Sequence, residues 1–90
     1  MTDKKFIQLC KEHVSDYFNK RAEKTDNVNI SPDDVYIVWY CKTLQNWKAL
    51  ASTKIPDGMY YELTLNGDKL ELYLDAYKKW DNICIAVLND

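Results

Sequence analysis

Residues 35–88 read VYIVWYCKTLQNWKALASTKIPDGMYYELTLNGDKLELYLDAYKKWDNICIAVL, and this stretch decides the fold. Four turn signals divide it into five pieces of strand length. The turn signals are Leu44-Gln45-Asn46, Pro56-Asp57-Gly58, Asn66-Gly67 and Asp81-Asn82. Within the pieces, β-branched and aromatic residues are dense and tend to alternate with polar ones, as they do in strands with one buried face. Short turns between consecutive strands are typical of antiparallel hairpins. The stretch therefore predicts a five-stranded antiparallel β-meander over about residues 35–88.

Ahead of the strands, one apolar stripe follows helical spacing. Its members are Phe6, Leu9, Cys10, His13, Val14, Tyr17 and Phe18. Asp3 can cap this helix, which we expect over about residues 3–23, followed by a turn region over 24–34. In that region Ser31-Pro32 precedes Asp33 and Asp34, which we expect to act as turn caps and not as catalysts. Ninety residues make one domain, 1–90, so the expected fold is α+β, with one N-terminal helix packed on the meander.

The turns also predict how the strands pair. A two-residue Asn66-Gly67 loop places Leu63 opposite Leu70, and the turn at Pro56-Asp57-Gly58 places Leu63 beside Ala51. A three-residue loop at residues 44–46 then sets Trp39 against Ala51 and Cys41 against Ala49. The row Ala49, Ala51 and Thr53 is small enough to form the bed on which the helix lies. Extending the row of Leu74 and Ala76 would place Lys78 on the core side unless a bulge intervenes. Beyond it, Ile83, Ile85 and Val87 alternate as in a fifth strand.

The opposite face of the predicted sheet is rich in tyrosine. We expect a partner to bind it through Tyr36, Tyr40, Lys48, Leu50, Tyr60, Tyr73 and Tyr77. One helix covers only one face, and tyrosine is favoured at interfaces, so the occupant is either another protein or a second copy in a homodimer. The alternative is that twist or strand closure buries these tyrosines within the monomer. The same pairing puts Glu62 opposite Glu71, with Lys48 or Lys69 between them, which suits a solvated sheet surface better than a pair of catalytic carboxylates.

No motif for catalysis, metal binding or a cofactor is evident, so we expect a noncatalytic protein with neither metal nor cofactor. Cys10 and His13 lie one helical turn apart, and we interpret them as core and boundary residues. The alternatives are a thiol–imidazole pair or a zinc site that adds Cys41 and Cys84. A second possible function is binding of single-stranded nucleic acid through Tyr40, Lys42, Trp47 and Lys48. The net charge of −2 and the acidic strands disfavour it.

Several segments resemble a family of small uncharacterised proteins from phages and prophages of Gram-positive bacteria. They are DVYIVWYCKTLQNWKAL at 34–50, DGMYYE at 57–62, NGDK at 66–69 and YLDAYKK at 73–79, and the resemblance covers most of residues 4–85. It implies a phage or prophage origin and expression in a bacterial cytoplasm. Three unpaired cysteines fit a reducing compartment, and no run of about 18 apolar residues or signal peptide is evident. We therefore expect a soluble, cytoplasmic phage accessory protein that acts by protein–protein interaction and modulates a host process.

Overall fold

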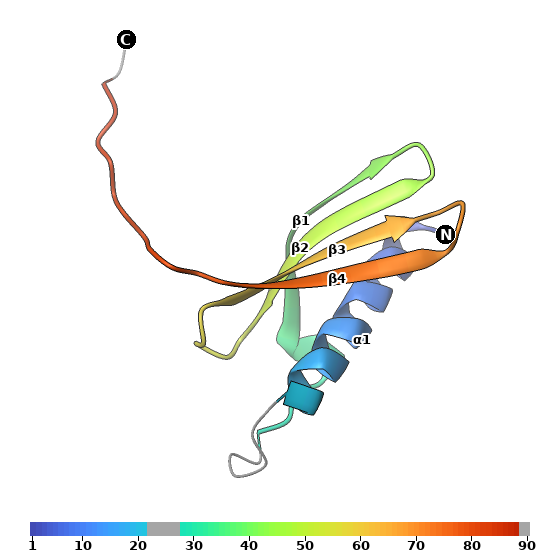
Figure 1. Ribbon diagram of the computed structural model, residues 1–90, viewed down its shortest axis with the longest axis horizontal. Helices are drawn as coiled ribbons and strands as arrows, with labels where there is room; N and C mark the ends of the chain where they lie inside the picture. The colour runs from blue at the N-terminus through green and yellow to red at the C-terminus, as the bar shows by residue number, and fades with distance from the viewer. Residues whose placement is uncertain (22–27, 89–90) are drawn as a thin grey trace.

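A single helix lies across one face of an antiparallel sheet (Figure 1). The computed structural model describes residues 1–21 and 28–88. Helix α1 (Asp3–Arg21) is followed by a 3₁₀ turn η1 (Pro32–Asp34) and by strands β1 (Val35–Thr43), β2 (Asn46–Thr53), β3 (Met59–Asn66) and β4 (Glu71–Lys78). The strands pair in chain order, β1-β2-β3-β4. The predicted α+β class and antiparallel sheet are confirmed, but the sheet has four strands and not five.

The residue that caps helix α1 lies one position before the predicted one. Thr2, not Asp3, is the cap: its Oγ1 accepts a hydrogen bond from the Lys5 N–H at 3.2 Å, and its carbonyl accepts one from Phe6 N–H at 2.9 Å. Asp3 lies in the first turn, where its charge suits the positive end of the helix. The predicted end of the helix at residue 23 lies outside the described residues, as does the first part of the predicted turn region. No helix in the described ranges is long and apolar enough to cross a membrane.

The core lies between α1 and the strand row beneath it. Phe6, Cys10 and Val14 are fully buried on the helix, and Ala49 and Ala51 are fully buried on β2. The two alanines let the helix approach closely, as the sequence predicted. Larger side chains from β2 and β3 complete the core, namely Trp47, Tyr61, Leu63 and Leu65. The helix packs mainly against η1, β1 and β2, so on this face of the sheet the end formed by β4 is less covered.

Two of the three hairpins pair in a different register from the predicted one, but with the same faces. Leu63 lies opposite Leu74 in β4 and opposite Ala49 in β2. The β3–β4 loop is longer than predicted because the Asn66 side-chain oxygen accepts hydrogen bonds from the N–H groups of residues 68 and 69, both at 3.1 Å. Both registers shift by an even number of residues. Since side chains alternate with a period of two, each residue keeps its predicted face.

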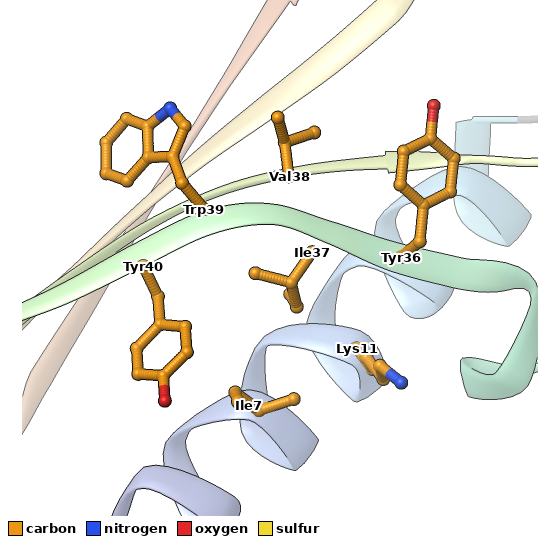
Figure 2. A pocket seen from close by; sticks show the side chains of 7 residues that line it. All are labelled: Ile7, Lys11, Tyr36, Ile37, Val38, Trp39 and Tyr40. Carbon is orange, nitrogen blue, oxygen red and sulfur yellow. The ribbon is translucent and has the colours of Figure 1, made fainter.

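The register of the first hairpin, β1–β2, differs beyond its bulge from the predicted one by an odd number of residues. This changes which side chains of β1 face the helix. The loop of this hairpin has two residues, Leu44 and Gln45, with Leu44 in the left-handed region at φ 56°. A β-bulge lies between Ile37 and Trp39, so that Ile37 pairs with Ala51 whereas Trp39 pairs with Leu50. The predicted pairing of Trp39 with Ala51 is therefore wrong. Beyond the bulge Tyr40 faces α1, and Trp39 and Cys41 face away from it, as Figure 2 shows for Tyr40 and Trp39.

The predicted fifth strand is not part of the sheet. After Lys79, whose N–H donates to the Gly58 carbonyl at 2.7 Å, the chain runs away from both sheet and helix (Figure 1). We call residues 79–88 the C-terminal arm. A strand added outside β4 would lie far from α1, which packs mainly over β1 and β2, so its apolar side chains would gain little burial there.

Candidate functional site: the uncovered face of the sheet

The side of the sheet that faces away from α1 is the candidate site, and we call it the open face. Six of the seven residues predicted for it do lie there, because Lys48 and Leu50 alternate with the buried residues of β2 and Tyr60 does so in β3. Tyr77 lies directly opposite Tyr60, and Tyr73 opposite Thr64. The open face comprises Tyr36, Val38, Trp39, Cys41, Lys48, Leu50, Tyr60, Glu62, Thr64, Tyr73, Asp75 and Tyr77.

Tyr40 is the exception, and the prediction that it shares this face is wrong. The bulge turns Tyr40 toward the helix, where its hydroxyl group lies 3.4 Å from Asp3 Oδ2. Trp39 takes the corresponding place on the open face, and Val38 lies beside it on the same side of β1 (Figure 2). The sequence predicts the side of Val38 correctly but puts Trp39 on the helix side, because residues 35–41 are apolar or aromatic throughout and fit either register.

The open face is partly exposed aromatic surface. The exposed fractions of Tyr36, Trp39, Tyr73 and Tyr77 are 49%, 44%, 55% and 53%. Leu50 and Tyr60, nearer the middle of the sheet, are half-buried. Among the residues that the structure describes, no segment folds over this face. Closure of the tyrosines within the monomer, the alternative left open by the sequence, is therefore not what the structure shows.

One ion pair lies on the open face. Lys48 Nζ is 2.9 Å from Glu62 Oε1, and Glu62 lies opposite Asp75 and not, as predicted, opposite Glu71. Hydrogen bonding to Glu62 and its negative charge raise the pKa of Lys48, with smaller contributions from Tyr77 and Asp75. The lysine thus offsets the repulsion between two facing carboxylates. This arrangement has the character of a solvated sheet surface.

A second polar contact lies at the edge of the face on β4. The Tyr73 hydroxyl group donates a hydrogen bond to Glu71 Oε2 at 2.7 Å, and this bond raises the pKa of Tyr73. The tyrosine therefore stays protonated near neutral pH. It presents an apolar ring with a polar tip, which is the combination that protein interfaces favour.

The residues considered for nucleic-acid binding do not form one surface. Trp47 is only 4% exposed and its ring centroid lies 5.3 Å from that of Phe6, so it is a core residue and is not available for stacking on a base. The Lys42 ammonium group lies 5.5 Å from the centroid of the Trp47 ring, on the helix side of the sheet. Lys48 lies on the open face. The set is therefore split between two faces.

The cysteines and the histidine are also distributed over separate places. Cys10 is fully buried, and desolvation by burial raises its pKa to about 12, so its thiol group stays protonated. His13 is exposed on α1, Cys41 lies in β1 and Cys84 lies in the C-terminal arm. Within residues 1–21 and 28–88, no three metal-ligating side chains of His, Cys, Asp or Glu gather in one place.

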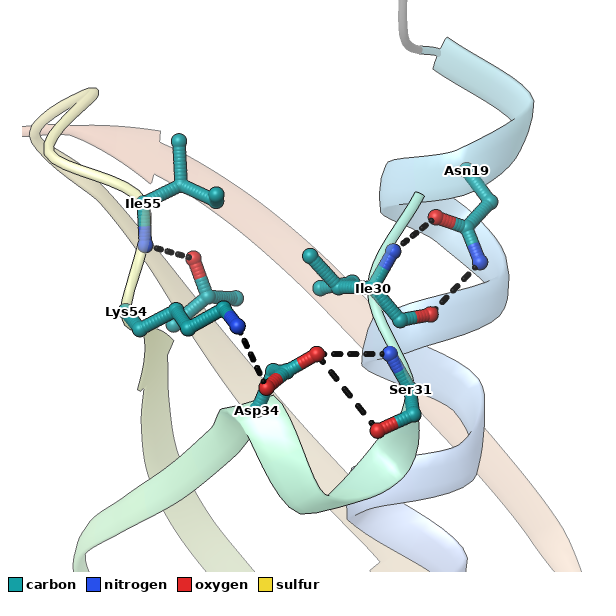
Figure 3. Close-up of polar contacts among 7 residues, drawn as sticks. Asn19, Ile30, Ser31, Asp34, Lys54 and Ile55 are labelled. Atoms are coloured by element: carbon teal, nitrogen blue, oxygen red, sulfur yellow. Dashed lines mark hydrogen bonds and ion pairs between the residues drawn. The ribbon is translucent and has the colours of Figure 1, made fainter. Parts of the chain in front are cut away.

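Asp34, in the turn before β1, has the structural role as a turn cap that the sequence predicted for it. Figure 3 shows its carboxylate between two partners: Oδ2 accepts from Ser31 N–H at 2.9 Å, and Oδ1 lies 2.9 Å from Lys54 Nζ. The hydrogen bond from Ser31, followed by the contacts with Lys54, lowers the pKa of Asp34. Nearby, the Asn19 side chain pairs with both the N–H and the carbonyl of Ile30, at 2.9 Å each. These contacts fix the start of β1 against the end of α1.

Fold and site define a small α+β domain with one helix, a four-stranded meander and an uncovered aromatic face. The model of a family of unknown function, DUF6275, matches residues 7–87, and the chain belongs to this family. Searches of curated proteins and of solved structures found no match.

Proposed function

We propose that the protein is a noncatalytic binding module whose open face docks a protein partner. The observation that carries the proposal is the half-exposed aromatic set on one continuous face, formed by Tyr36, Trp39, Tyr73 and Tyr77. Monomeric proteins rarely leave a large apolar patch bare, and tyrosine and tryptophan are enriched among the few residues that contribute most to binding at protein interfaces.

The charges of the face support a protein as the partner and not a nucleic acid. Its one lysine, Lys48, is already paired with Glu62, and Asp75 adds a further negative charge. Binding of a phosphate backbone requires several free cationic groups. A partner with an apolar patch and a basic rim would match this face better. The buried, protonated thiol of Cys10 and the structural role of Asp34 support a noncatalytic function.

The resemblance to phage and prophage proteins extends this proposal. On that basis the chain is a phage accessory protein that works in the cytoplasm of its bacterial host and modulates a host process by docking. The partner is then a host or phage protein.

A capture experiment with matched variants tests the proposal. Wild-type protein, Tyr73→Ala, Trp39→Ala and the control Leu44→Ala are immobilised, and proteins retained from a bacterial lysate are identified by mass spectrometry. Leu44 is 77% exposed in the β1–β2 loop, outside the open face. We expect at least one protein to be retained by the wild type and the control and lost with both open-face variants. The purified candidate should then bind the wild type and the control with equal affinity in a titration.

Two results would refute the proposal. One is that no retained protein depends on the open face although all four proteins are folded. The other is that Tyr73→Ala unfolds the domain, because that side chain would then belong to the core.

A further inference from the structure

The C-terminal arm is apolar, alternating and without a partner in the described part of the chain. Its large side chains are almost fully exposed: Ile83 by 69%, Ile85 by 77%, Val87 by 89% and Leu88 by 94%. Ile83, Ile85 and Val87 fall on one side of an extended chain, and Cys84, Ala86 and Leu88 fall on the other. A segment of this kind has the pattern of a strand that is buried on at least one face.

The whole chain also exposes more surface, and is less compact, than a typical folded monomer of its size. It exposes 7000 Å² at a mass of 10.6 kDa, whereas a typical monomer of that mass exposes about 5,500 Å², so the excess is about 1,500 Å². Its radius of gyration is 15.3 Å, against about 12 Å for a compact chain of this length. Two copies that each buried this excess would form an interface well above the standard size of about 1,600 Å² in total.

The sheet offers two edges at which a strand could add, and they differ in charge. Strand order leaves one side of β1 and one side of β4 unpaired. The β4 sequence carries Glu71, Asp75 and Lys78, and charged residues are a common protection of edge strands against pairing. The β1 sequence contains a single charged residue, Lys42, within nine residues. By charge the β1 edge is therefore the better acceptor, and the bulge between Ile37 and Trp39 is the irregularity that an added strand has to follow.

The space beside β1 also suits the arm. A groove of about 510 Å³ lies along the edge of β1 beside α1, and its lining includes Lys11 of the helix and the open-face residues Tyr36, Val38 and Trp39. On its helix side, Figure 2 shows Ile7 of the helix facing Ile37 and Tyr40 of the strand. The corresponding groove between α1 and β4 is smaller, about 340 Å³, and is lined in part by His13, Asp16 and Lys20. Because α1 packs over β1, a strand added at the β1 edge still contacts the helix.

We propose that two copies of this chain exchange their C-terminal arms. Residues 83–88 of each copy add as a strand along the β1 edge of the other, with Ile83, Ile85 and Val87 in the groove between α1 and β1. Two equivalent contacts related by a two-fold axis close the assembly as a dimer. Residues 79–82 link β4 to this strand and can extend about 13 Å, so the two sheets of the dimer must lie close together. The proposal goes beyond the proposed function, because it uses the β1 edge and the groove beside it and leaves the part of the open face on β2, β3 and β4 free.

The first measurement is the mass in solution by size-exclusion chromatography with light scattering, over a concentration series. The buffer is reducing, so that a disulfide through Cys84 cannot imitate the dimer. We expect the full-length wild type to be a dimer. Ile85→Lys should raise the dimer dissociation constant about 100-fold or more, because both contacts lose a buried isoleucine. The matched control Ala86→Lys lies on the other side of the arm and should stay within a few-fold of the wild type.

Complementation of two variants identifies the contacting surfaces. Tyr40→Glu places a charge in the groove and should also give a monomer. Mixed in equal amounts, Ile85→Lys and Tyr40→Glu should form a heterodimer, because one native arm meets one native groove and the other contact joins opposite charges. Circular dichroism should show that each variant alone is folded, since Ile85 and Tyr40 are 77% and 40% exposed.

Three results would overturn the proposal. They are a wild type that is monomeric at all concentrations, a dimer that Ile85→Lys leaves intact, and a failure of the two variants to complement each other. Hydrogen exchange separates the monomeric cases, since an arm folded on its own β4 is protected and an unpartnered arm is not. Tyr73→Ala should leave the dimer intact, so that failure of arm exchange is distinguishable from failure of the proposed function.

Discussion

Two tryptophans that lie on opposite faces of the first hairpin provide a direct test of the bulge in β1. Trp47 is 4% exposed on the helix face, whereas Trp39 is 44% exposed on the open face. We predict that Trp47→Ala destabilises the domain by about 3–5 kcal/mol, as large aromatic truncations in cores do. Full burial of an aromatic side chain contributes about 1.5–3 kcal/mol, and Trp39 is little more than half buried, so Trp39→Ala should cost about 1–1.5 kcal/mol.

Urea unfolding, followed by far-ultraviolet circular dichroism, measures the difference. With a slope of about 1 kcal/mol per molar urea, the two midpoints should differ by about 1.5–4 M. The pair is well matched because the same residue type is removed in both variants, so that changes in the unfolded chain largely cancel. All samples are compared at one protein concentration, because dimerisation would add to the apparent stability.

Equal losses of stability would refute the reasoning. In the hairpin without a bulge, Trp39 would lie against Ala51 beneath the helix and its truncation would create a core cavity. A cost of about 3–5 kcal/mol for Trp39→Ala would therefore place it in the core and return Tyr40 to the open face.

Three further predictions concern the loops, the acidic turn and the buried thiol. Gly67→Ala should destabilise the domain by about 1–3 kcal/mol in urea unfolding, because the added Cβ would lie 1.8 Å from the Gln45 carbonyl oxygen and must separate two loops. The lowered pKa of Asp34 makes its contribution to stability complete above about pH 5 and lost as the pH falls through the folded-state pKa. Asp34→Asn should therefore be less stable near neutral pH and show a flatter acid dependence of the urea midpoint. At about pH 8, iodoacetamide should modify the two other cysteines and leave Cys10, whose pKa is about 12, unreacted in intact-mass spectrometry.

Each of these has a control or a contrary result. Gly58→Ala serves beside Gly67→Ala, since its added Cβ has only one neighbour, at 3.9 Å, and the cost arises from its φ of 73° alone. An unchanged acid dependence in Asp34→Asn would mean that the contacts with Ser31 and Lys54 do not stabilise the folded state. Rapid alkylation of Cys10 under native conditions would contradict its burial.

The sequence by itself was sufficient for the order of the helix and the first four strands, the bed of alanines under the helix and the faces of β2, β3 and β4. It could do this because nearly every second residue of those strands, on the side toward the helix, is apolar. An error of two or four residues in pairing, as occurred around Leu63, moves each residue along its strand without changing its face. Six of the seven residues predicted for the open face lie on it, and five of them are in β2, β3 and β4, where this reason applies.

Only the tertiary structure decided the face of Tyr40 and Trp39 and the place of the C-terminal arm. Residues 35–41 are apolar or aromatic throughout, so either face can be buried, and the bulge between Ile37 and Trp39 determines which of them face α1. The arm carries apolar residues at alternate positions, as a strand does. This pattern is the same whether the arm pairs with the sheet of its own chain or with that of a second copy. Alternation specifies that a side of the chain is to be buried, whereas what buries it depends on the packing of the whole molecule.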